Sequence, residues 1–94
     1  MEKPVHFSRH ALQQMIERGA TDDEVLEAIR SGEQVSAKRG RLGYRKNFQY
    51  ERLWGGRYYP IKQVLAIVAE EPQTLVVVTV YTFYTLIASS CSYR

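Results

Sequence analysis

The sequence predicts an α+β domain in which two N-terminal helices pack on one face of a four-stranded antiparallel sheet. Two amphipathic segments with helix-capping signals occupy the first third of the chain. Runs of alternating or wholly apolar residues, joined by short turns, fill most of the rest. A length of 94 residues suits one domain, residues 1–94, with one modest core.

The first helix is expected from His10 to Arg18. Ser8 is its N-cap, and Gly19 ends it in the left-handed conformation. Its apolar side chains form one stripe that we expect to be buried: Ala11, Leu12, Met15 and Ile16. Before the helix, Val5-His6-Phe7 predicts a brief edge strand.

The second helix begins with a capping box. Thr21 is followed three residues later by Glu24, and acidic residues fill the first turn, where the helix dipole favours them. Gly32 closes the helix. Its buried stripe is expected to consist of Val25, Leu26, Ala28 and Ile29. The connection between the helices is so short that they must form a hairpin, whose apolar stripes can cover the sheet.

Four strands are predicted after the helices. Residues 33–41 form a weak strand that ends in a basic turn, and residues 43–54 form a half-buried strand. Gly55-Gly56 predicts a hairpin into a return strand, in which residues 63–70 are apolar on both faces. The strongest strand signal is Leu75–Tyr84, ten residues without glycine, proline or charge, which belongs in the interior of a sheet.

Side chains alternate across this last strand. Val76, Val78 and Val80 are therefore expected to share the face that the helices cover. Tyr81 and Phe83 are expected on the opposite face.

The charge is unevenly distributed, although the net charge is only +3. Residues 1–37 carry four basic and seven acidic side chains, whereas residues 38–62 carry eight basic side chains and one acidic. A basic middle segment of this kind suggests an anionic partner.

Several features favour a cytoplasmic protein. There is no apolar run of membrane-spanning length, no signal-peptide pattern, and only one cysteine, Cys91. Residues 86–94 are expected to be a disordered tail. No spacing of histidine, cysteine or carboxylate residues indicates a metal site, and no cofactor is expected.

Residues Ser8–Ala20 resemble a small bacterial family of unknown function whose first helix carries the signature S-x-H-A-x-x-x-M-x-x-R-x-I/A. The resemblance extends over about residues 6–84. That family is distantly similar to the RelE/ParE/BrnT-type toxins, which place two N-terminal helices on an antiparallel sheet and in many cases cleave mRNA without a metal. The resemblance implies an RNA endonuclease paired with a small antitoxin protein. The tail after Tyr84 departs from those toxins whose catalytic residue lies at the C-terminus.

Metal-independent RNA cleavage needs a base, an acid and cations that stabilise the phosphorane. The candidates for catalysis are His10, Arg45, Lys46 and Tyr81. The candidates for RNA binding are Arg18, Lys38, Arg39, Arg41, Arg52 and Arg57. Alternation leaves open which residues of the strand 43–54 join Tyr81, Lys46 with the aromatic residues or Arg45 with Asn47.

Each candidate also has a purely structural interpretation. His10 suits an ordinary helix surface, and Arg18 suits a salt bridge to the second helix or a cap at the end of its own helix. The basic run suits a solvated loop, and Tyr81 suits packing on a sheet face with its hydroxyl in water. The same surface suits an RNA-binding module without catalysis. A third interpretation is a protein-interaction domain or homodimer, in which Tyr44, Phe48, Tyr50 and Trp54 form the interface.

Overall fold

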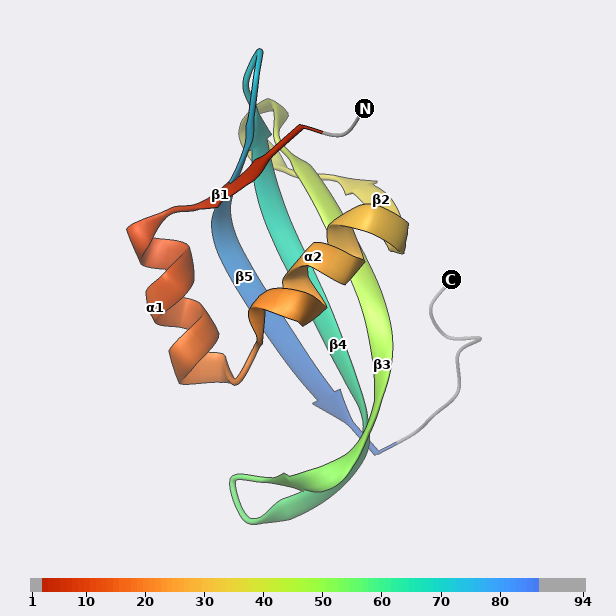
Figure 1. The fold of residues 1–94 in the computed structure, drawn as a ribbon. Helices are drawn as coiled ribbons and strands as arrows, with labels where there is room; N and C mark the ends of the chain where they lie inside the picture. The colour runs from red at the N-terminus through yellow and green to blue at the C-terminus, as the bar shows by residue number, and fades with distance from the viewer. Residues whose placement is uncertain (1–2, 87–94) are drawn as a thin grey trace.

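A computed structural model describes residues 3–86 and confirms an α+β architecture with two helices on one sheet (Figure 1). In chain order the elements are β1 (Val5–Phe7), α1 (Arg9–Arg18), α2 (Asp22–Ser31), β2 (Glu33–Ser36), the short 3₁₀ turn η1 (Lys38–Gly40), β3 (Leu42–Trp54), β4 (Arg57–Glu70) and β5 (Leu75–Thr85). Neither helix of the described part is long and apolar enough to cross a membrane. The predicted tail, apart from Leu86, lies outside the described residues.

The sheet has five strands in the order β1-β5-β4-β3-β2, and it is mixed rather than purely antiparallel. The predicted edge strand is present, but it pairs with β5 in parallel, from Val5 opposite Leu75 to Phe7 opposite Val77. The prediction of four antiparallel strands was therefore incomplete. A three-residue strand carries no signal of its partner, because that pairing depends on where the end of the chain returns.

The helix boundaries agree with the capping signals. The Ser8 hydroxyl accepts a hydrogen bond from the amide of Ala11, and Gly19 has φ 79°. Thr21 and Glu24 make both hydrogen bonds of the capping box, each 3.1 Å long. Local side-chain chemistry fixes where these helices begin and end.

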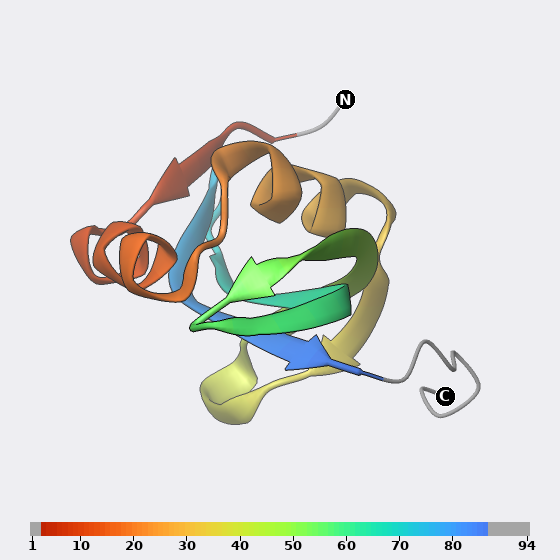
Figure 2. The same cartoon turned by 90° about the horizontal axis from the view of Figure 1, so that it is seen from below.

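The buried stripe of α1 differs from the predicted one. Ala11 and Met15 are buried, but Leu12 is 44% exposed and Ile16 is 77% exposed. Gln14 is buried instead. The reason is the position of the helix, which lies beside the edge of β5, while α2 lies over the sheet (Figure 2). A helix at an edge turns a partly polar face inwards, towards the strand backbone.

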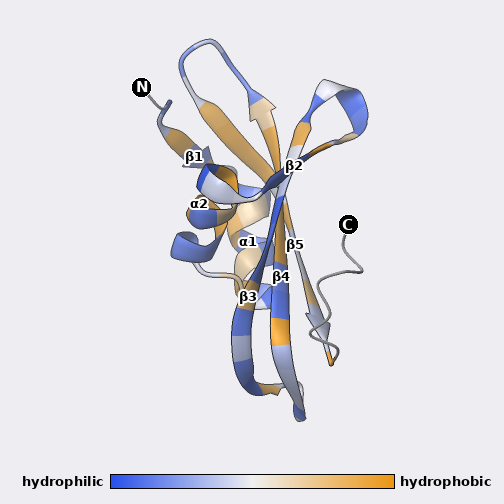
Figure 3. Ribbon diagram, turned by 90° about the vertical axis from the view of Figure 1, so that its right-hand side faces the viewer, coloured by the Kyte–Doolittle hydropathy of each residue, from blue (hydrophilic) through white to orange (hydrophobic). Residues whose placement is uncertain are grey.

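A β-bulge changes the alternation of β5. Ile67 pairs with Thr79 but Val68 pairs with Val77, so Val78 is an extra residue. The buried residues are accordingly Val77 and Val80, and the predicted grouping of Val76, Val78 and Val80 on one covered face was wrong. Beyond the bulge, Tyr81 and Phe83 face away from the helices, as predicted, since they pair with half-exposed positions of β4. Figure 3 shows both helices on one side of the sheet, which leaves what we call the open face on the other.

Among residues 3–86 the core contains one buried cation, Lys62 of β4. Its side chain is 3% exposed and forms an ion pair of 2.7 Å with Glu24. Its Nζ also donates to the carbonyl of Gly19 at 2.6 Å, and it lies 5.0 Å from the ring centre of Tyr50. Lys62 thus fastens the connection between the helices to the middle of the sheet.

The far end of the β3–β4 hairpin bends back towards the helices (Figure 2). A register shift between Gln49 and Arg52, with Glu51 at φ 52°, produces the bend. Trp54 consequently stacks on Tyr84, with ring centres 4.9 Å apart. The four aromatic residues expected at a protein interface are all half-buried on the helix side: Tyr44, Phe48, Tyr50 and Trp54.

We predict that Lys62→Met lowers the free energy of unfolding by about 3 kcal/mol, because it leaves Glu24 without its buried partner and the Gly19 carbonyl without its donor. Urea denaturation measures the change. Lys38→Met, in the exposed turn η1, is the control and should leave stability unchanged. A Lys62→Met protein as stable as the parent would contradict the role given to this ion pair.

Candidate active site at the edge of β5

Side chains of α1 form hydrogen bonds with the backbone of β5 where β1 no longer pairs with that strand. The strand β1 pairs with β5 only as far as Val77, and beyond this point α1 lies alongside. The amide of Val80 donates to Oε1 of Gln14 at 3.0 Å, and the carbonyl of Val80 accepts from Nη1 of Arg18 at 2.7 Å. A helix that bonds to a strand edge in this way is held at a fixed height along the strand.

Both the backbone carbonyl and the side chain of Arg18 contact residues of β5. Its backbone carbonyl accepts hydrogen bonds from the hydroxyls of Thr82 (2.9 Å) and Tyr84 (2.7 Å). Its guanidinium lies over the ring of Tyr81, with Cζ 5.1 Å from the ring centre. The structural role predicted as an alternative, a salt bridge to the second helix, is not what these contacts show. Arg18 instead reaches round the sheet edge to the open face.

Tyr81 and Phe83 are two exposed rings on that face. Their side chains are 38% and 49% exposed, and their rings are nearly parallel with centres 6.3 Å apart. Exposed aromatic rings next to a guanidinium can stack on nucleobases while the cation contacts phosphate.

His10 belongs to the same side of α1. It precedes Gln14 by four residues and Arg18 by eight, and such positions follow one another along one helix face. Gln14 and Arg18 both bond to Val80, so His10 lies one turn further along this face, towards the start of the helix. Its side chain is exposed. Helix periodicity thus aligns His10 with Arg18, whose guanidinium contacts Tyr81 at the sheet edge.

Arg45 and Lys46 lie on opposite faces of β3, so the three residues Arg45, Lys46 and Tyr81 do not form one sheet-borne site. Arg45 pairs with Leu65, which pairs with Tyr81, and this row belongs to the open face. Lys46 points to the helix side, where its Nζ is 2.7 Å from Glu27. This lysine holds the pKa of the Glu27 carboxyl below its usual range, chiefly through the hydrogen bond between them. Alternation alone left open whether Lys46 or Arg45 shares the face of Tyr81. The strand pairing shows that it is Arg45.

The remaining basic candidates form two groups at opposite ends of β3. Lys38, Arg39 and Arg41 lie in and next to η1, a turn on the open-face side of the sheet (Figure 3). Arg52 and Arg57 flank the hairpin that bends to the helix side, and Arg52 lies over Tyr50 at 5.6 Å. The eight basic residues of the middle segment therefore do not make one continuous patch.

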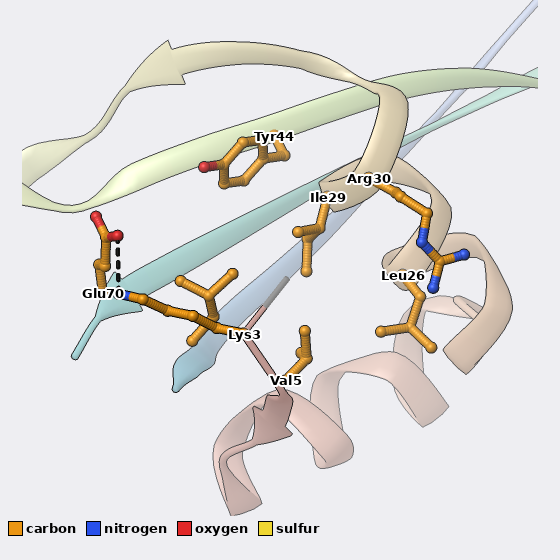
Figure 4. Close-up of a pocket in the computed structure, with 8 residues that line it drawn as sticks. Lys3, Val5, Leu26, Ile29, Arg30, Tyr44 and Glu70 are labelled. Carbon is orange, nitrogen blue, oxygen red and sulfur yellow. Dashed lines mark hydrogen bonds and ion pairs between the residues drawn. The ribbon is translucent and has the colours of Figure 1, made fainter. Parts of the chain in front are cut away.

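A cavity of about 270 Å³ lies elsewhere, between α2 and β1 (Figure 4). Its walls include the apolar side chains of Val5, Leu26 and Ile29, and the ion pair of Lys3 with Glu70 (3.0 Å) stands at its rim. None of the predicted site residues lines it. Within residues 3–86, no three histidine, cysteine or carboxylate side chains lie close enough together to hold a metal ion.

Sequence reasoning missed the residues that position Arg18. Gln14 stands among the polar residues of an amphipathic pattern, where nothing distinguishes a buried amide from an exposed one. Thr82 and Tyr84 alternate with Tyr81 and Phe83, and this pattern shows that they face the helix side once the phase of the strand is known. The bulge that sets the phase has no clear sequence signal.

The comparison with protein families matches residues 7–82 to the domain of unknown function DUF4258, and the chain therefore belongs to this family. No curated protein and no solved structure matches the chain. Membership of a small domain family of unknown function confirms that part of the resemblance. The relationship to RelE-type toxins stays a prediction.

We predict that Tyr84, one of the seven tyrosines, loses its proton well above the usual range of a phenol. Burial raises the pKa of Tyr84 to about 12, and the nearby Tyr50 and Glu24 raise it further against a lowering hydrogen bond from Thr82. The stability that comes from this shift is complete below about pH 10 and is lost as the pH rises towards 12, because the folded protein holds the proton more tightly. Ultraviolet titration of the phenolate measures it.

Tyr84→Phe is the matching variant for this titration and should remove the step near pH 12, whereas Tyr58→Phe, at an exposed position, should leave that step in place. If the Tyr84→Phe curve keeps a step near pH 12, the assignment is wrong.

Proposed function

We propose that the protein is a toxin-type RNA endonuclease that cleaves without a metal, with its reacting centre at the edge between α1 and β5. The observation that carries the proposal is the Arg18 guanidinium held against the exposed ring of Tyr81, on the helix face that also carries His10. The first-helix signature resembles that of a family distantly similar to the RelE/ParE/BrnT-type toxins, and this resemblance supports the same conclusion. We also propose that the fold is a variant of the RelE-type fold with an added parallel strand, β1.

The proposed reaction is an attack of the RNA on itself. The His10 imidazole takes the proton of a ribose 2′-hydroxyl, whose oxygen attacks the adjacent phosphorus. The bond from phosphorus to the 5′-oxygen breaks, and that oxygen takes a proton from water, while the His10 imidazolium gives its proton to the hydroxide that remains. The products are a 2′,3′-cyclic phosphate and a 5′-hydroxyl, so atoms and charges balance without a metal or cofactor.

Arg18 and Tyr81 have different roles in this proposal. The Arg18 guanidinium stabilises the negative charge that builds up on the phosphorane, because it is a fixed cation at the sheet edge. The ring of Tyr81 stacks on a base and sets the position of the phosphate. A small antitoxin protein that covers the same edge is the partner that such an activity requires.

We predict that His10→Ala and Arg18→Ala each lower the rate of RNA cleavage by about 100-fold or more, since each removes a group used in the transition state. The assay follows end-labelled RNA in the presence of EDTA and identifies the cyclic phosphate at the new end. Arg18→Lys, which keeps the charge but loses the planar contact with Tyr81, should retain part of the activity.

Matched controls exist for each change. His6→Ala replaces an exposed histidine on β1, and Arg30→Ala replaces an exposed arginine of α2. Both should cleave at the parent rate. The proposal fails if His10→Ala is as active as the parent, or if the parent binds RNA and leaves it intact. The second result would identify a non-catalytic RNA-binding module.

A further inference from the structure

The open face continues from Tyr81 towards a pair of amide side chains. Phe83 pairs in register with Gln63 of β4, and Gln63 pairs with Asn47 of β3. Nε2 of Gln63 donates to Oδ1 of Asn47 at 3.0 Å. From β5 to β3 is two strand spacings, about 10 Å. A polar row therefore leads from the exposed ring of Phe83 across the sheet, away from the edge that carries Arg18.

This row ends in a hollow of about 230 Å³ beside β3, which we call the edge hollow. Its walls include Gly32, Glu33, Arg45, Lys46, Asn47 and Gln63. It opens where β3 loses its neighbour, because β2 begins only at Glu33, opposite Arg45. The edge hollow brings Arg45 and Lys46 to one place although their side chains start on opposite faces.

Gly32 forms the wall between the end of α2 and β3. A Cβ at this position would collide with the carbonyl oxygen of Ala28 and would lie 2.5 Å from that of Arg45. The close approach, rather than an unusual φ, requires glycine here. The backbone beside the edge hollow is accordingly fixed.

The polar atoms of the edge hollow include both donors and acceptors. The bond between the amides leaves Oε1 of Gln63 as an acceptor and Nδ2 of Asn47 as a donor. Arg45 bonds through Nε to Glu33 at 3.0 Å, which aligns its remaining guanidinium donors beside a carboxylate. Lys46 bonds to Glu27 and Ser31, so it is oriented but already neutralised.

We infer that the edge hollow receives one guanine base of a single-stranded RNA whose neighbouring bases stack on Phe83 and Tyr81. Guanine carries two acceptors, O6 and N7, which suit Arg45 and Asn47, and two donors, N1–H and N2–H₂, which suit Gln63 and Glu33. A duplex buries its bases in the stack, so the substrate is single-stranded. The inference rests on the proposed function, for which it supplies the base that selects the cleavage site.

Charge supports RNA as the occupant of this face. The basic turn of Lys38, Arg39 and Arg41 lies on the same side of the sheet, and Arg18 stands at the opposite end of the row. Phosphates of a strand that crosses the sheet would pass between these cations. The acidic first turn of α2 lies on the other side, with the helices (Figure 2).

The test measures binding to 2′-O-methyl RNA, which lacks the attacking hydroxyl and is not cleaved. Fluorescence anisotropy compares oligouridine carrying one central guanine with the same strand carrying adenine or cytosine, at constant salt. The guanine strand should bind about tenfold more tightly than the others, the discrimination expected of one good pair of base contacts. Its hybrid with a complementary strand should bind more weakly.

Gln63→Leu and Asn47→Ala should each remove most of this preference and leave affinity for oligouridine nearly unchanged. Gln34→Leu, an exposed amide of β2 outside the edge hollow, is the matched control and should keep the preference. Asn47 is itself exposed, so its variant tests the site even if Gln63→Leu fails to fold. Equal affinity for all the strands, or an unchanged preference in Asn47→Ala, would overturn the inference.

The two proposals can fail separately. If the protein prefers guanine but does not cleave natural RNA, the inference about the edge hollow stands and the proposed reaction is wrong. If cleavage depends on His10 but binding shows no base preference, the proposed reaction stands and the inference about the edge hollow is wrong.

Discussion

The unpaired edge of β5 is the constraint from which the rest of the site follows. A strand of eleven residues with a parallel partner over only three leaves backbone groups that must be satisfied in another way. Side chains of α1 do so at Val80, and the hydroxyls of Thr82 and Tyr84 return hydrogen bonds to the end of the helix. The helix is thereby placed beside the sheet, so that Arg18 bonds to the helix side through its backbone carbonyl and contacts Tyr81 on the open face through its side chain.

The ion pair of Lys62 also helps to fix α1 beside the sheet, from within the core. It binds the carbonyl of Gly19, directly after Arg18, and so fixes the end of α1 against the middle strand. A buried lysine is costly unless it is fully bonded, and here a carboxylate, a carbonyl and two tyrosine rings surround it. Apolar packing alone does not specify the height of one element relative to another, whereas this set of directional contacts does.

Much of the architecture could be predicted because it depends on short-range chemistry. The caps at Ser8 and Thr21, the glycine at the end of α1 and the hairpin at Gly55-Gly56 all act within a few residues. The prediction failed where one element determines the orientation of another. The bulge at Val78 reversed the alternation of β5, and the edge position of α1 exposed Ile16 and buried Gln14. Neither event changes the local pattern from which the faces were assigned.

The same distinction, between local sequence pattern and the placement of one element relative to another, explains which candidate residues lie together. Residue types indicate that imidazole, guanidinium and phenol groups are present, but whether these groups lie close together depends on strand phase and register. Arg45 and Lys46 are neighbours in sequence and point to opposite sides, while Arg18 and Tyr81 are far apart in sequence and touch. At a sheet edge, a site consists of residues from one helix and one strand. These residues share no sequence pattern and lie together only because they are at the same height along the edge. The hydrogen bonds between side chains and backbone that set this height therefore decide which cation faces which ring.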